Sequence, residues 1–83
     1  MQYELCEYNR DRKVIAVGKY NEIYQALVAW YEDLGEGRYD PYYPSTEADL
    51  IEQIESDPDG EAGGAPRESP TGDTEYIIRK ANQ

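Results

Sequence analysis

The chain has 83 residues with 18 acidic and 8 basic side chains, so its formal net charge is −10. This length fits one small domain, and the acidic excess excludes a protein that binds nucleic acid through a basic surface of its own. Histidine is absent, which removes the usual general base near neutral pH and the commonest transition-metal ligand. Cys6 is the single cysteine, so no internal disulfide can form and an apolar core must hold the domain together.

That core must be modest in size. Only 39% of the residues are hydrophobic, phenylalanine is absent, and nine tyrosines with Trp30 supply all the aromatic area. No apolar run approaches the roughly 20 residues that a membrane helix needs, and the first residues form neither a basic nor a hydrophobic signal region. We therefore expect a single domain over residues 1–83 that is cytoplasmic and contacts no membrane.

The net charge comes from one segment of the chain. Residues 32–61 contain eleven acids and one base, whereas the other 53 residues contain seven of each. A salt-adapted protein would spread its carboxylates over the whole surface, so this concentration favours a local acidic patch. The alternative is an acidic face whose only role is to keep a small protein soluble.

The chain begins with two short runs rich in tyrosine and β-branched residues, 3–8 and 14–20, which are separated by the polar segment 9–13. This pattern predicts a β-hairpin. Both faces of the second run are apolar, which favours a central or covered strand.

Two helices are expected next. The first runs from about Asn21, a suitable N-cap, to Leu34, because apolar residues recur there every three or four positions. A proline-, glycine- and tyrosine-rich loop over residues 36–44 separates it from a second helix over residues 46–56, with Ser45 as N-cap. The second helix places Leu50, Ile51 and Ile54 in one apolar stripe, Asp49 and Glu52 on the opposite side, and Glu55 beside the stripe.

Residues 57–73 are rich in proline and glycine and contain almost no large apolar side chain, so we expect a mobile acidic loop. A strand over residues 74–80 follows and most simply pairs with the first hairpin. The expected fold class is therefore α+β, a three-stranded antiparallel sheet covered by two helices, in the order ββααβ.

The sequence does not favour catalysis or metal binding. Glu55, Asp57 and Asp59 followed by Gly60 resemble the first ligand positions and the bend of an EF-hand loop. Counted from Glu55, however, the twelfth position is Pro66 where a bidentate acid is needed, and no helix follows. Cys6 has no histidine to activate it and is expected in the core. So short a chain also leaves little room for a substrate cleft. We expect no enzymatic activity and no catalytic residue, cofactor or metal.

Acidic and tyrosine side chains occur together from residue 31 into the second helix. Basic clefts bind such a surface through carboxylate–guanidinium pairs and guanidinium–tyrosine stacking, and the same clefts normally bind nucleic acid. Carboxylates three residues apart on a helix advance about 4.5 Å, and alternate ones on an extended segment such as 57–61 about 6.7 Å, which is the scale of phosphate spacing. The candidate partner-binding residues are Glu32, Asp33, Glu36, Tyr39, Asp40, Tyr42, Tyr43, Asp49, Glu52, Glu55, Asp57 and Asp59.

These residues predict a nucleic-acid mimic, a small inhibitor that occupies the basic groove of a nucleic-acid-binding protein such as a nuclease or another defence effector. In size and charge the chain resembles the phage-encoded inhibitors of host defence, such as anti-restriction and anti-CRISPR proteins. This resemblance is one of composition, transfers no residues, and implies action in the host cytoplasm.

Other functions stay open. An adaptor or assembly module would bind a protein through the tyrosine-rich surface without competing with nucleic acid. A homodimer would use strand edges or the apolar surface near Trp30, so the chain is expected to be a monomer or a homodimer. For Tyr39, Tyr42 and Tyr43, the alternative to exposure is that they pack their loop onto the first helix.

Overall fold

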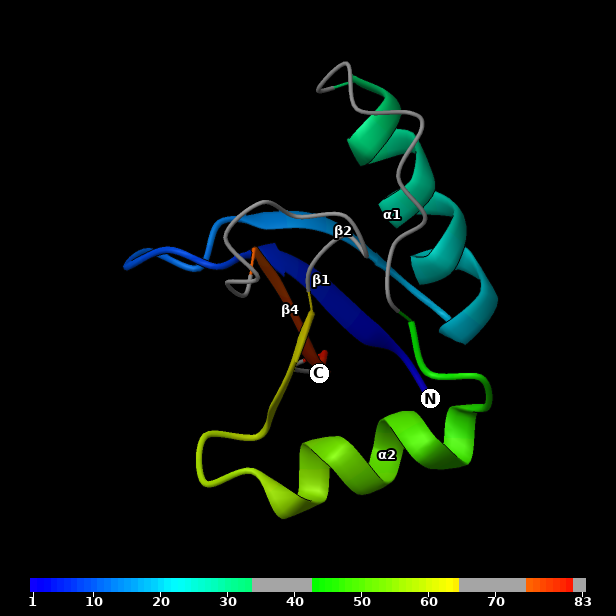
Figure 1. Ribbon diagram of the computed structural model, residues 1–83, viewed down its shortest axis with the longest axis vertical. Coiled ribbons are helices and arrows are strands. Elements are labelled where there is room, and N and C mark those ends of the chain that lie inside the picture. Colours follow the sequence, from blue (N-terminus) through cyan, green and yellow to red (C-terminus); the bar gives the residue numbers. More distant parts are fainter. Residues whose placement is uncertain (34–42, 65–74, 82–83) are drawn as a thin grey trace.

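The computed structural model describes residues 1–33, 43–64 and 75–81 (Figure 1). In chain order its elements are β1 (Tyr3–Glu7), β2 (Val14–Gly18), α1 (Tyr20–Asp33), α2 (Glu47–Ser56), β3 (Glu61–Gly64) and β4 (Tyr76–Lys80). The strands form one antiparallel sheet in the order β2-β1-β4-β3. The α+β class, the antiparallel sheet and the two helices are thus confirmed. The three-stranded sheet in the order ββααβ is wrong, because the described chain runs ββααββ.

The additional strand β3 lies inside the segment that was predicted to be a mobile loop. It is ordered without a large apolar side chain of its own, because its backbone pairs with β4 and Ala62 is buried. Gly64 lies opposite Tyr76 in this pairing, and the Tyr76 ring occupies the space where a side chain on Gly64 would project. An aromatic ring from the neighbouring strand can stabilise glycine in a sheet in this way. Residues 65–73 of the predicted loop lie outside the described part of the chain.

A tight turn over residues 57–60 leads from α2 into β3. The Gly60 N–H donates to the carbonyl of Asp57 at 3.1 Å, and Gly60 has a φ of 71°, which glycine adopts without strain. The Asp57 carboxylate accepts from the N–H groups of Asp59 at 2.9 Å and Glu61 at 3.2 Å. The three carboxylates at 57, 59 and 61 therefore do not form the extended row expected from their alternate spacing.

Both helices cover the same face of the sheet. α1 packs against β2 and β1, and α2 packs against β4 and β3. The buried side chains of the helices and strands form one cluster, which confirms the apolar stripes expected for both helices. The cluster consists of Tyr3, Leu5, Ile23, Leu27, Tyr31, Leu50, Ile54, Ala62, Tyr76 and Ile78.

The start of α1 differs slightly from the prediction. The helix begins at Tyr20, so Asn21 lies in its first turn and is not the N-cap. The backbone N–H of Lys19 instead donates to Oε1 of Glu22 at 2.8 Å, which is the reciprocal half of a capping box. Leu34, the predicted end of this helix, lies outside the described residues.

The start of α2 differs from the prediction by one residue. Its N-cap is Thr46 and not Ser45, because the Thr46 hydroxyl accepts from the N–H of Asp49 at 3.2 Å and Thr46 has an extended backbone. Threonine and serine make the same capping contact, so the sequence did not distinguish these two neighbours.

The position of β2 in the sheet corrects another expectation. β2 is an edge strand, and 42% of Val14 and 53% of Val17 are exposed. β1 is an interior strand because β4 pairs on its other side. Its Cys6 is fully buried, but on the face of the sheet opposite the core cluster. Apolar residues on both faces of β2 therefore did not indicate burial on both faces.

Candidate partner-binding surface

Asp49, Glu52 and Glu55 lie on the exposed side of α2, and we call these three residues the α2 ridge. Leu50 and Ile54 bury the opposite side of the helix in the core, so the predicted orientation is confirmed. The ridge carboxylates follow one another at three-residue steps, each about 4.5 Å further along the helix axis.

The α2 ridge has little neutralising charge close to it. Lys80 Nζ lies 3.6 Å from Glu55 Oε2, but both side chains are largely exposed to solvent. Such a pair contributes at most about 1 kcal/mol, because water and salt screen it. Among the residues that the structure describes, Asp49 and Glu52 form no ion pair. Two of the three ridge carboxylates thus face solvent without a basic partner in that part of the chain.

Asp57 and Asp59 lie on the turn that follows α2 directly. One oxygen of the Asp57 carboxylate is bound to backbone N–H groups of the turn. Asp59 is exposed. The turn therefore continues the acidic surface from the end of α2, with Asp59 more available to a partner than Asp57.

The acidic segment does not form one patch in the described structure. Glu32 is exposed at the C-terminal end of α1, and this end points away from α2 (Figure 1). Asp33 closes the same helix. Tyr31, which adjoins them in the sequence, is buried in the core. The structure thus brings together the candidates on α2 and its turn and separates them from those at the end of α1.

Tyr43 packs inside the fold. Its ring lies 5.0 Å from that of Tyr20 and 5.3 Å from that of Tyr24, and its O–H donates to the Tyr20 carbonyl at 2.6 Å. Burial raises the pKa of Tyr43 above its usual range. These contacts support the packing alternative for Tyr43. The candidates Glu36, Tyr39, Asp40 and Tyr42 lie outside the described residues.

The described tyrosines are mostly structural. Two of them are largely exposed, Tyr8 after β1 and Tyr24 on α1. The others lie in or against the core, namely Tyr3, Tyr20, Tyr31, Tyr43 and Tyr76.

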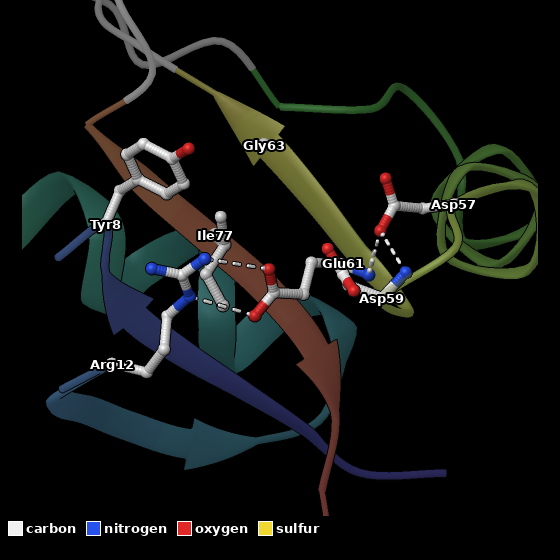
Figure 2. A pocket seen from close by; sticks show the side chains of 7 residues that line it. All are labelled: Tyr8, Arg12, Asp57, Asp59, Glu61, Gly63 and Ile77. Atoms are coloured by element: carbon white, nitrogen blue, oxygen red, sulfur yellow. Dashed lines mark hydrogen bonds and ion pairs between the residues drawn. The ribbon is translucent and has the colours of Figure 1, made fainter. Parts of the chain in front are cut away.

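The sheet face opposite α1 and α2, here called the outer face, carries an ion pair that the sequence did not reveal (Figure 2). Arg12 binds Glu61 through two contacts, Nε to Oε2 at 3.0 Å and Nη2 to Oε1 at 3.2 Å. The guanidinium also lies 4.7 Å from the centre of the Tyr8 ring. The pair joins residues 49 positions apart, and it was missed because β3, which positions Glu61, was not predicted.

These side chains surround a hollow of about 280 Å³ on the outer face, lined by Tyr8, Arg12, Asp57, Asp59, Glu61, Gly63 and Ile77 (Figure 2). The Arg12 and Glu61 charges neutralise each other there.

Within the described residues, no group of three or more carboxylate or thiol side chains could hold a metal ion. No helix in that part of the chain has the length and apolar character needed to cross a membrane. Comparison with protein-family models, curated proteins and solved structures gives no match to this chain. The chain is thus a small α+β protein with an acidic helix face, and its own surface must carry the functional argument.

Proposed function

We propose that this protein is a small inhibitor that mimics nucleic acid and binds the basic nucleic-acid-binding groove of another protein. The observation that supports this proposal is the α2 ridge, whose carboxylates project at regular intervals from a helix anchored in the core. A fixed helix holds these charges at defined spacings, so ordering them on binding costs less entropy than ordering charges on a flexible tail.

The chemistry of such a groove matches the ridge. Lysine and arginine side chains that bind phosphates also bind carboxylates through charge-assisted hydrogen bonds. Each exposed pair is weak by itself, so affinity would come from several pairs acting together. Binding should therefore weaken steeply with ionic strength, and nucleic acid should compete for the same groups.

The biological setting that we propose is inhibition of a host-defence effector, such as a restriction or CRISPR nuclease, by a phage protein. The compact size and the acidic surface suit a protein that must block a groove in the host cytoplasm. The alternative is an adaptor that binds through tyrosines. It has less support, because five of the seven described tyrosines lie in or against the core.

The experiment compares two variants of equal charge change. Asp49→Asn/Glu52→Gln removes two carboxylates from the α2 ridge, and Asp11→Asn/Glu75→Gln removes two carboxylates away from it. The immobilised wild type captures proteins from a lysate of the native host. Each retained protein is then purified, and its affinity for the wild type and both variants is measured at several salt concentrations.

The proposal requires a retained nucleic-acid-binding protein whose affinity falls about tenfold for the ridge variant and less than twofold for the control variant. Equal losses of affinity in both variants would show that binding depends on the net charge of the protein and not on the α2 ridge, which would contradict the proposal. A partner that binds at undiminished affinity in high salt would favour the adaptor.

A further inference from the structure

The outer face buries two residues although both helices lie on the other side of the sheet. Cys6 and Ile77 pair in register between β1 and β4, and their side chains are 0% and 2% exposed. They point away from the core cluster, because side chains alternate along a strand and their neighbours Leu5 and Ile78 belong to that cluster. Something other than α1 or α2 must therefore shield them from water.

Among the described residues, four charged side chains lie close enough to Cys6 to act on its thiol, namely Glu4, Arg12, Glu61 and Arg79. Along the rows of the sheet, Glu4 lies opposite Arg79, which lies opposite Glu61. Arg79 Nε binds Glu4 Oε1 at 2.8 Å, and Arg12 forms its two contacts with Glu61. Figure 2 shows the Arg12–Glu61 pair lying across the strand that carries Ile77, between the Tyr8 ring and the turn before β3.

Arg12 lies in the hairpin turn, and its guanidinium contacts three other residues. Its φ is 51°, a left-handed conformation that arginine rarely adopts. Its guanidinium contacts Glu61, the Tyr8 ring and the carbonyl of Asn9. These contacts join the β1–β2 turn to β3, which is the edge strand on the other side of the sheet from β2.

We propose that the Arg12–Glu61 pair is a strap that closes the outer face over Cys6, and that opening of the strap controls access to the thiol. Among the described residues of this edge, β3 contributes only Glu61 and Gly63 to the outer face, and Gly63 has no side chain. Both side chains of the pair remain partly accessible to solvent, so salt weakens the strap. The inference does not depend on the proposed function.

The single cysteine is a built-in reporter of this opening. The rate of Cys6 alkylation by N-ethylmaleimide, an uncharged reagent, is measured in Arg12→Gln and in the matched control Arg10→Gln. Arg10 lies in the same turn and is exposed, so both variants lose one positive charge from one region. Circular dichroism and urea unfolding verify that each variant is folded under the labelling conditions.

Electrostatics alone would change the rate in the opposite direction. Burial raises the pKa of the Cys6 thiol, and the positive charge of Arg12 acts to lower it. Removing Arg12 therefore disfavours the reactive thiolate. Faster alkylation of Arg12→Gln therefore reports greater access, and the free energy of unfolding from urea shows whether that access exceeds what global unfolding allows.

We expect alkylation of Arg12→Gln to be about five to ten times faster than that of the wild type, the factor that loss of one charge-assisted pair would give. Arg10→Gln should react at the wild-type rate. Added salt should accelerate the wild type more than Arg12→Gln. Equal rates in Arg12→Gln and the wild type, or equal acceleration in both variants, would overturn the proposal. If Arg12→Gln does not fold, the same alkylation rate is measured in Arg12→Lys, which keeps the charge but loses the two-point contact with Glu61. It should then be alkylated faster than the wild type.

Discussion

A methyl group added at Gly64 tests how β3 is ordered. A Cβ atom at this position would lie 2.5 Å from Cζ and 2.8 Å from Cε2 of the Tyr76 ring. Carbon atoms in contact are normally about 3.5–4.0 Å apart, so the ring would have to move by about 1 Å. It has no free space for this movement, because Tyr76 is buried and its ring packs edge-on against Tyr31 and Trp30.

The expected cost follows from these distances. Overpacking of a buried site costs about 1–3 kcal/mol, and replacing glycine by alanine recovers about 0.4–1 kcal/mol by restricting the unfolded chain. We therefore expect Gly64→Ala to lower the free energy of unfolding by about 1–2 kcal/mol. For a domain of this size the midpoint temperature should fall by about 5–10 °C.

Urea unfolding of a double-mutant cycle measures this effect. In the Tyr76→Leu background, Gly64→Ala should cost less than about 0.5 kcal/mol, because the smaller side chain leaves room for the methyl group. If Gly64→Ala is as stable as the wild type, or if its cost is unchanged in the Tyr76→Leu background, the Tyr76 ring does not order β3.

Three further predictions concern stability. Thr46→Ala should lower the free energy of unfolding by about 1 kcal/mol through loss of the helix cap, whereas Ser45→Ala should change it by less than about 0.3 kcal/mol; chemical denaturation distinguishes the two. Glu4 and Arg79 form a partly buried pair, so a double-mutant cycle with Glu4→Gln and Arg79→Gln should give a coupling of about 1 kcal/mol, and additive losses would contradict the pair. Burial and the nearby Glu47 carboxylate raise the pKa of Tyr3 above its usual value of about 10. The folded state therefore keeps this proton more tightly than the unfolded state, so stability should be constant below about pH 10 and fall above it. Urea midpoints at pH 8 and pH 10.5 should differ less in Tyr3→Phe than in the wild type, and an equal difference would contradict this assignment.

Local patterns predicted the helices well. In α1 and α2 the apolar spacing of three and four residues identified the buried side. The cap of α2 was wrong by one residue because Ser45 and Thr46 offer the same hydroxyl, and α1 starts two residues earlier than its predicted cap implied. The buried side of a helix and its cap depend on residues within one or two turns of each other, so they can be predicted from the local sequence.

The sheet was harder to predict because its order depends on distant residues. β3 looks like a flexible loop from its own composition. It becomes a strand through its pairing with β4, where Tyr76, twelve positions after Gly64, fills the space that the glycine leaves. In the same way, the edge position of β2 depends on β4 pairing with the far side of β1.

For the candidate surface, the sequence predicted the direction of side chains within one helix but not which helices lie near each other. Asp49, Glu52 and Glu55 were placed correctly because helical geometry fixes their direction. Glu32 was grouped with them from its position in the sequence, but α1 directs it toward another part of the molecule. The tyrosine-rich sequence suggests Tyr43 as a binding residue, but its ring and hydroxyl pack against α1.

The central claim is that the α2 ridge and nucleic acid compete for one groove. The most direct test titrates the protein into a complex of its purified partner with fluorescently labelled duplex, and follows the anisotropy of the duplex. Competition predicts that the duplex is released completely and that the apparent Kd of the partner for the duplex rises linearly with the protein concentration. The variant Asp49→Asn/Glu52→Gln should need about tenfold higher concentration than the wild type for the same release. A ternary complex in which the partner holds the duplex and the protein together, with the anisotropy undiminished, would contradict the account.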